Sequence, residues 1–150
     1  MGTVKAPWKQ LLLDALEANS HLKHSSFFHL ATVGCNGRPS NRTVVFRGFQ
    51  DDSDKIQINT DYRSRKIEEL KHCPFAEICW YFTDSWEQFR INGKIDIIDG
   101  TNTDPLKLQV RETNTLLRLG CVLCFSFTSC YLKVCTFGML GFVEATFKSK

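Results

Sequence analysis

The stretch KIQINTDYRSRKIEEL, residues 55–70, decides how this chain is interpreted. Residues 55–60 predict a strand, and the run after them predicts a helix that ends near residue 73, with Asp61 as its N-cap. Three cations stand in or beside the first helical turn: Arg63, Arg65 and Lys66. A helix N-terminus carries partial positive charge, so cations are unfavourable there. A bound anion, with phosphate as the natural candidate, would remove the conflict, because backbone N–H groups, Ser64 and the cations would all converge on it.

The same cations have a simpler explanation, which the residues alone leave open. Arg65 or Lys66 would pair with a neighbouring acid, Asp61, Glu68 or Glu69, on an exposed helix start. Surface ion pairs of this kind are common and contribute little to stability. An anion site and a solvated helix face are therefore both compatible with the pattern.

The rest of the hydrophobic pattern predicts a mainly β domain with flanking helices. The expected elements are a helix over 6–18, strands over 27–33, 41–49, 55–60, 75–82 and 89–97, and a short helix over about 104–112. Asn36-Gly37 predicts a hairpin between the first two strands. Residues 89–97 alternate strictly between apolar and polar side chains, so one face of that strand is expected in the core. The order helix, three strands, helix, two strands indicates a small antiparallel sheet or barrel.

Length and composition narrow the class of protein. The chain has 150 residues, 23% of them charged, with a net charge of +3, which fits one ordinary globular domain. This charge is too small to indicate a nucleic-acid surface or a polybasic membrane patch. Seven cysteines without a secretory signal favour free thiols in a reducing compartment. A cytoplasmic location is expected, with the plastid as the alternative.

The C-terminal part of the chain has a different texture. Residues 119–143 are rich in Leu, Phe, Cys, Val and Gly, contain Lys133 as their only charge, and show neither helical nor alternating periodicity. The segment is long enough to form a membrane-spanning helix, but the lysine near its centre disfavours one. Four cysteines, at 121, 124, 130 and 135, have some of the spacings of a zinc site but lack a histidine and turn-forming residues. The four histidines show no ligand or triad spacing, so no metal site and no catalytic side chain is predicted.

A second group of candidate residues lies on the strand over 41–49. Alternation places Arg42, Val44 and Phe46 on one face and Thr43, Val45 and Arg47 on the other. One arginine could thus reach an anion while the other reaches a second substrate or a partner subunit. Both could equally be surface cations at strand ends. Gln88 begins the alternating strand on its polar face and could be no more than an exposed polar residue.

Four segments taken together, residues 42–49, 57–61, 64–66 and 86–90, resemble the pyridoxamine 5′-phosphate oxidase family, and most closely its plant and cyanobacterial branch. The resemblance covers about residues 6–112. It implies an FMN-binding split β-barrel, with FMN at a homodimer interface. The implied reaction is oxidation of pyridoxamine or pyridoxine 5′-phosphate by O₂ to pyridoxal 5′-phosphate, a step of vitamin B6 salvage.

The resemblance also implies a set of FMN-binding residues in this chain. They are Arg42, Thr43, Val44, Val45, Phe46, Arg47, Asn59, Thr60, Ser64, Arg65, Lys66 and Gln88. Arg47 would lie near the substrate as well as the flavin. Oxidases of the family generally carry lysine there, and the planar, forked guanidinium of arginine would meet a substrate differently.

Nothing in residues 113–150 matches the family pattern. The predicted organisation is therefore an FMN-binding domain over 1–112, with its N-terminal helix, and a divergent apolar tail over 113–150. The barrel is expected to be incomplete. The alternative function that follows is an FMN- or phosphate-binding module without oxidase activity, because the substrate contacts of the distal barrel would be missing.

Overall fold

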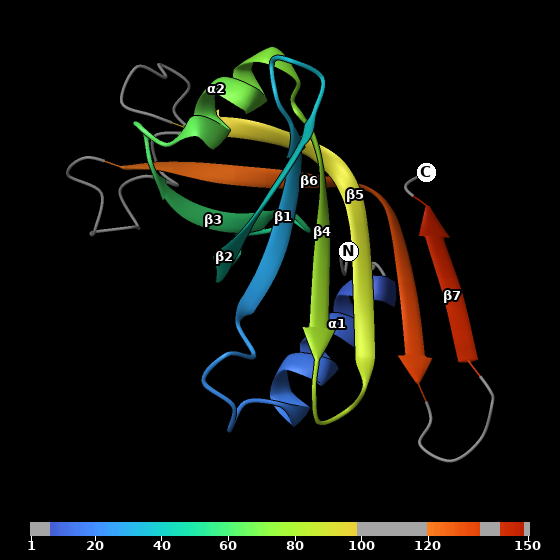
Figure 1. Ribbon diagram of the computed structural model, residues 1–150. Coiled ribbons are helices and arrows are strands. Elements are labelled where there is room, and N and C mark those ends of the chain that lie inside the picture. The colour runs from blue at the N-terminus through green and yellow to red at the C-terminus, as the bar shows by residue number, and fades with distance from the viewer. Residues whose placement is uncertain (1–6, 99–119, 136–141, 149–150) are drawn as a thin grey trace.

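The computed structural model describes residues 7–98, 120–135 and 142–148, the last two ranges by their backbone alone. Two helices and seven strands lie in this part of the chain (Figure 1). In chain order they are α1 (Pro7–Ala18), β1 (Phe27–Val33), β2 (Pro39–Phe49), β3 (Ile56–Asp61), α2 (Arg65–His72), β4 (Phe75–Phe82), β5 (Glu87–Ile98), β6 (Gly120–Cys135) and β7 (Phe142–Lys148). The elements predicted up to residue 98 are present; strand ends are shifted by at most two residues, and α2 begins three residues later than an N-cap at Asp61 would place it. The short helix expected over 104–112 falls outside the described residues.

The strands form one antiparallel sheet that curls into a ring. Its order is β3-β2-β1-β4-β5-β6-β7, and β6 pairs a second time, with β3. This second pairing joins the two ends of the six-strand run, so β1 to β6 form a barrel and β7 extends the sheet beyond β6 (Figure 1). The mainly β architecture with flanking helices is confirmed.

Strands β6 and β7 occupy the region for which the sequence showed no periodicity. β6 is 16 residues long and pairs with all of β5, from Glu87 opposite Val134 to Ile98 opposite Val122. The register shifts between Asn92 and Gly93, so β6 carries an extra residue there. Such a bulge breaks a period-2 pattern into two halves of opposite phase, and a single alternation cannot run through the strand. In the described part of the chain, no helix is long and apolar enough to cross a membrane.

The core fills the barrel from alternate positions of its strands. On β5 the residues Phe89, Ile91 and Ile95 are buried while Arg90, Asn92 and Lys94 are exposed, as the alternation predicted. Trp80 of β4 is fully buried among Phe28, Phe46 and Phe82. Its indole N–H donates to the Ser25 carbonyl at 2.8 Å, so this large side chain is buried without an unpaired donor.

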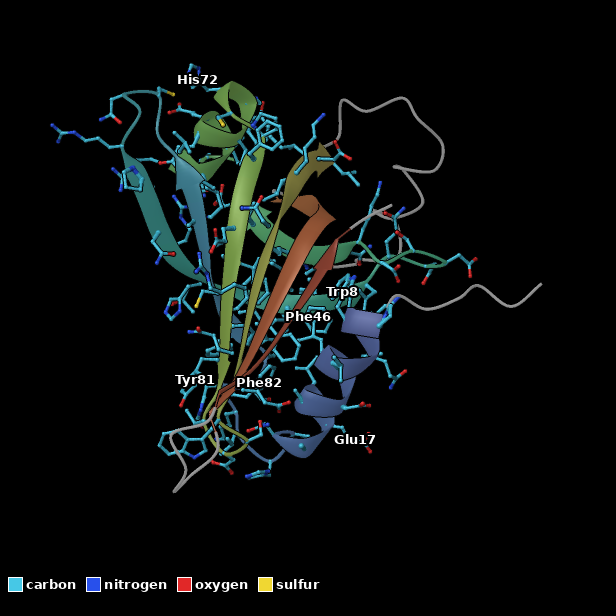
Figure 2. The ribbon with its side chains drawn as sticks, turned by 90° about the vertical axis from the view of Figure 1, so that its right-hand side faces the viewer. Trp8, Glu17, Phe46, His72, Tyr81 and Phe82 are labelled. Atoms are coloured by element: carbon cyan, nitrogen blue, oxygen red, sulfur yellow. The ribbon has the colours of Figure 1, made fainter. Side chains whose placement is uncertain are left out.

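Helix α1 covers one side of the barrel. Trp8, Leu12 and Ala15, spaced three to four residues apart, are its buried face. Figure 2 shows Trp8 and Phe46 between this helix and the sheet, with Glu17 on the outer side of the helix. In Figure 1, α1 lies beside the β4–β5 turn, and α2 lies at the opposite end of the sheet.

Candidate functional site

Helix α2 begins differently from the sequence prediction. Its N-cap is Ser64, in an extended conformation, and not Asp61. The Asp61 carboxylate instead accepts bonds from the backbone N–H and the guanidinium of Arg63, at 2.7–3.1 Å. These bonds, the side-chain one foremost, hold the pKa of Asp61 at about 2. The prediction was wrong because a carboxylate followed two residues later by arginine closes a local turn with it, which leaves the capping position to Ser64.

Three polar side chains meet at the junction of β3 and α2, and we call Thr60, Ser64 and Lys66 the junction cluster. The Lys66 ammonium donates to Thr60 Oγ1 at 2.8 Å and to Ser64 Oγ at 3.1 Å. The two hydroxyl oxygens are 3.3 Å apart. All three residues are half-buried, and the Ser64 hydroxyl makes no capping bond to the helix. A lysine, two hydroxyls and a helix start in one place match the donors that a phosphate group requires.

Two neighbours of the junction cluster also have unused polar groups. The side-chain oxygen of Asn59 is buried and has no hydrogen-bond partner within the described residues. Such an atom costs about 1–3 kcal/mol unless something satisfies it. Arg65 is exposed and forms no ion pair with the described side chains. Of the three cations at this helix start, Arg63 is paired with Asp61, and Lys66 donates to Thr60 and Ser64. Arg65 is exposed to solvent.

Arg42 is held in a partly buried network beneath α2. Its guanidinium donates to the Leu30 carbonyl at 3.1 Å, to Thr32 Oγ1 at 2.6 Å and to Glu69 Oε2 at 2.6 Å. Burial alone would raise the pKa of Glu69. Hydrogen bonds from Thr32, Ser40 and Arg42, together with the charge of Arg42, outweigh burial and hold that pKa below its ordinary value.

The face of β2 opposite Arg42 carries Thr43, Val45 and Arg47. Thr43 and Arg47 are exposed and Val45 is half-buried, whereas Val44 on the inner face is buried. The sequence-based division of the strand into two faces is thus confirmed. Arg47 precedes an irregularity in the β2–β3 pairing, where Gly48 has a φ of +114°. The bulge leaves Arg47 on the outer surface, without an ion pair among the described side chains.

Gln88 lies far along the sheet from the junction cluster. Asn59 of β3 and Ile98 of β5 both pair with Val122 of β6, and Gln88 is ten residues further along β5. At about 3.3 Å per residue this is roughly 30 Å of strand. Figure 2 shows the same separation, with His72 of α2 and Tyr81, the cross-strand partner of Gln88, at opposite ends of the sheet. One chain therefore does not bring Gln88 next to the cluster.

The Gln88 amide has a sulfur neighbour. It donates to the Cys79 thiol at 3.6 Å, and burial raises the pKa of that thiol. Among the side chains that the structure describes, no three His, Cys, Asp or Glu residues could hold a metal ion. The four C-terminal cysteines considered for zinc lie where only the backbone is described.

Sequence reasoning missed Glu69 as part of the site region. Its only signal is its place in α2 between Ile67 and Leu70, which are both buried. A carboxylate flanked by buried apolar residues would have to find a cationic partner. The pattern does not say which cation that is, and Arg42 lies 27 residues away in the chain.

A curled antiparallel barrel with a cationic helix start beside one strand end is the architecture expected for a flavin-binding split barrel. Comparison with known proteins agrees. The family model described as "Pyridoxamine 5'-phosphate oxidase, FMN-binding domain" matches residues 5–99. The chain therefore belongs to the pyridoxamine 5′-phosphate oxidase family, through its FMN-binding domain.

Individual relatives support this assignment. The chain is 74% identical over 112 residues to pyridoxine/pyridoxamine 5′-phosphate oxidase 2 of Arabidopsis thaliana, covering 75% of this chain and 57% of that protein. It is 37% identical over 97 residues to the oxidase of Methylibium petroleiphilum, covering 65% and 44%. A crystal structure of a pyridoxamine 5′-phosphate oxidase-related, FMN-binding protein from Nostoc punctiforme superposes with a TM-score of 0.81 at 25% identity, over 99% of this chain and 100% of that one. The chain thus spans about half the length of these two curated relatives.

FMN is the cofactor of this domain, and the residues present fit it. The junction cluster supplies an ammonium, two hydroxyls and a helix start, which suit a phosphate monoester. The unpartnered oxygen of Asn59 lies in the residue directly before Thr60 and suits a hydroxyl donor, such as those of a ribityl chain.

Proposed function

We propose that this chain acts in the FMN-dependent oxidation of pyridoxamine or pyridoxine 5′-phosphate to pyridoxal 5′-phosphate. The observation that carries the proposal is the junction cluster, placed inside a domain of the FMN-binding family. The names of the Arabidopsis and Methylibium relatives supply the substrate class. The product would serve vitamin B6 metabolism.

The proposed roles follow from where the side chains lie. Lys66, Ser64 and Thr60 would hold the FMN phosphate, and exposed Arg65 would add charge at its rim. Asn59 would accept a hydrogen bond from the cofactor, and β2 residues 43–46 would line it. Arg47, on the outer face, would meet both cofactor and substrate. Bound FMN would supply the two-electron chemistry, in which a hydride leaves substrate carbon C4′ and the electrons pass to O₂.

A homodimer is part of this proposal. The outer face of β1 and β4 exposes large apolar side chains: Phe27, Val33, Phe75 and Tyr81. By the β1–β4 register they form two pairs, one at each end of the two strands, and exposed apolar side chains on one sheet face are typical of a protein–protein contact. The proposed partner on this face is a second copy of the chain, because Gln88 is remote from the junction cluster of its own chain. A partner's Gln88 would then complete the flavin site.

A second candidate function is FMN binding without oxidase activity. One observation favours it: over 99% of its length the chain superposes on the whole of the Nostoc protein, which is named only as oxidase-related and FMN-binding. In this case the junction cluster would hold FMN as proposed, but contacts to the substrate phosphate would be absent.

Turnover by the FMN-loaded protein separates the two candidates. The purified chain is loaded with FMN, desalted and supplied with pyridoxamine 5′-phosphate in air, and pyridoxal 5′-phosphate is measured by its absorbance. Product formation that disappears without FMN supports the oxidase. Stable flavin absorbance without product supports the binding module, and loss of flavin on desalting contradicts both.

A further inference from the structure

The outer face of β4 and β5 carries polar side chains that contact one another diagonally across the two strands. Arg90 of β5 stands opposite Cys79 of β4, but its guanidinium donates to Glu77 at 2.7 Å. Gln88 stands opposite Tyr81, but its amide donates to the Cys79 sulfur at 3.6 Å. Diagonal neighbours in an antiparallel pair are within reach of long side chains. Both β5 side chains therefore lean one step away from the β4–β5 turn, and Gln88 comes to lie against Cys79.

The Cys79 thiol is suited to hold a neutral amide in this place. It is half-buried and forms no disulfide. Burial raises the pKa of this thiol in spite of the nearby Arg90 charge, so at neutral pH the sulfur is a protonated thiol. A neutral thiol sulfur accepts an N–H bond without placing a charge beside the ligand that the glutamine would meet.

A hydrogen bond at its nitrogen fixes how the Gln88 amide is turned. An amide side chain has its two N–H donors at one end and its carbonyl acceptor at the other. With the nitrogen bound to Cys79, the carbonyl oxygen accepts no bond from the described side chains and is available to a ligand. A glutamine that is already held in one orientation also loses less rotamer freedom when it binds.

We propose that Cys79 is a positioning residue for Gln88: its thiol holds the amide nitrogen, so that the Gln88 carbonyl oxygen is presented to the flavin. Cys79 acts through Gln88. The inference rests on the proposed function, in which Gln88 of one chain completes the flavin site of the other.

A double-mutant cycle on the full-length chain tests this role. Titration with FMN gives the Kd and the visible absorbance spectrum of the bound flavin for the wild type, Cys79→Ala, Gln88→Ala and the double variant. Gln88→Ala should raise the Kd about three- to tenfold, as expected for one neutral hydrogen bond. Cys79→Ala should raise it about twofold or more, but by no more than Gln88→Ala does.

The double variant decides whether the effect passes through Gln88. In the Gln88→Ala background, Cys79→Ala should change neither the Kd nor the flavin spectrum any further, because the side chain that it positions is already absent. A further loss as large as that of Cys79→Ala alone would overturn the proposal, since the thiol would then act independently of Gln88.

Two further variants separate positioning from packing. Cys79→Ser keeps a small hydrogen-bond acceptor and should bring the Kd and the flavin spectrum back toward the wild type. Cys35→Ala removes an exposed thiol between β1 and β2 and should have no effect. If Cys79→Ser is as impaired as Cys79→Ala, the thiol serves only packing and the proposal fails.

The contact itself can be tested without the cofactor. In apo protein with isotopically labelled glutamine, Gln88→Leu identifies the Gln88 side-chain amide signal by NMR. Its N–H protons should exchange with water faster in Cys79→Ala than in the wild type, because the bond to sulfur protects one of them. Equal exchange rates would overturn the contact and the proposal with it.

The outcomes also separate this inference from the proposed function. A Kd for FMN that is unchanged in Gln88→Ala would refute the place of Gln88 at the flavin, and this inference with it. Weaker binding in Gln88→Ala with an unchanged Kd in Cys79→Ala would refute the positioning role of the thiol alone.

Discussion

Replacing Lys66 with alanine tests the junction cluster most directly among single substitutions. The Lys66 ammonium is half-buried and already directed at Thr60 and Ser64, with bonds of 2.8 and 3.1 Å. A phosphate held there would gain a charge-assisted hydrogen bond from a preorganised donor, worth about 1.5–3 kcal/mol. Because about 1.4 kcal/mol corresponds to a factor of ten, Lys66→Ala should raise the Kd for FMN about 10- to 150-fold.

The assay is titration of apo protein with FMN, followed by quenching of flavin fluorescence. Lys71→Ala is the matched control, because Lys71 lies in the last turn of the same helix and donates to Tyr62 on the surface. It should leave the Kd unchanged. Arg65→Ala should weaken binding less than Lys66→Ala, because Arg65 is exposed and solvent screens its charge. If Lys66→Ala binds FMN within about twofold of wild type, the cluster does not hold the phosphate.

Three further predictions concern stability and assembly. The folded-state pKa of Glu69 is lowered from its ordinary value of 4.5, so the Glu69 carboxylate stabilises the fold above pH 4.5, and this stabilisation is lost as pH falls through the folded pKa. Urea unfolding of the apo protein between pH 6 and about pH 3 should show the loss as a fall in the free energy of unfolding. A wild-type pH profile parallel to that of Glu69→Gln would exclude this contribution. Gly48 has a φ of +114°, so Gly48→Ala should lower the free energy of unfolding by about 1–3 kcal/mol, whereas an unchanged urea midpoint would mean that β2 relaxes at no cost. Phe75 is 59% exposed on the proposed dimer face, and Phe75→Asp should shift the mass in analytical ultracentrifugation from dimer to monomer, while a dimeric variant would place the contact elsewhere.

Much of the fold is predictable from local patterns, because β4 and β5 alternate cleanly and the β1–β2 hairpin has Asn36-Gly37 at its turn. The closing strand β6 is not predictable in this way. It pairs with β5 and with β3, and its register with β5 shifts by one residue, so no single alternation along the sequence is expected to mark it.

The candidate site, like the fold, is predictable from the sequence only where its features are local. The excess of cations at the start of α2 is a local feature of the sequence, and it directs attention to residues 64–66. Arg63 has a local partner, Asp61, two residues earlier, and Lys66 reaches back to Thr60 of β3. The partner of Arg42 in β2, by contrast, is Glu69 of α2 and depends on tertiary structure. No spacing rule could assign Arg42 to a carboxylate 27 residues away, because that contact exists only after α2 packs on the barrel.

Comparison of FMN with riboflavin tests the central claim most directly, because the two ligands differ only in the phosphate. If the junction cluster holds that phosphate through at least two charge-assisted contacts, the wild-type chain should bind FMN about 100-fold or more tightly than riboflavin. The preference should also shrink in Lys66→Ala. Equal Kd values for the two ligands, within about threefold, would contradict the account, since the phosphate would then contribute almost nothing to binding.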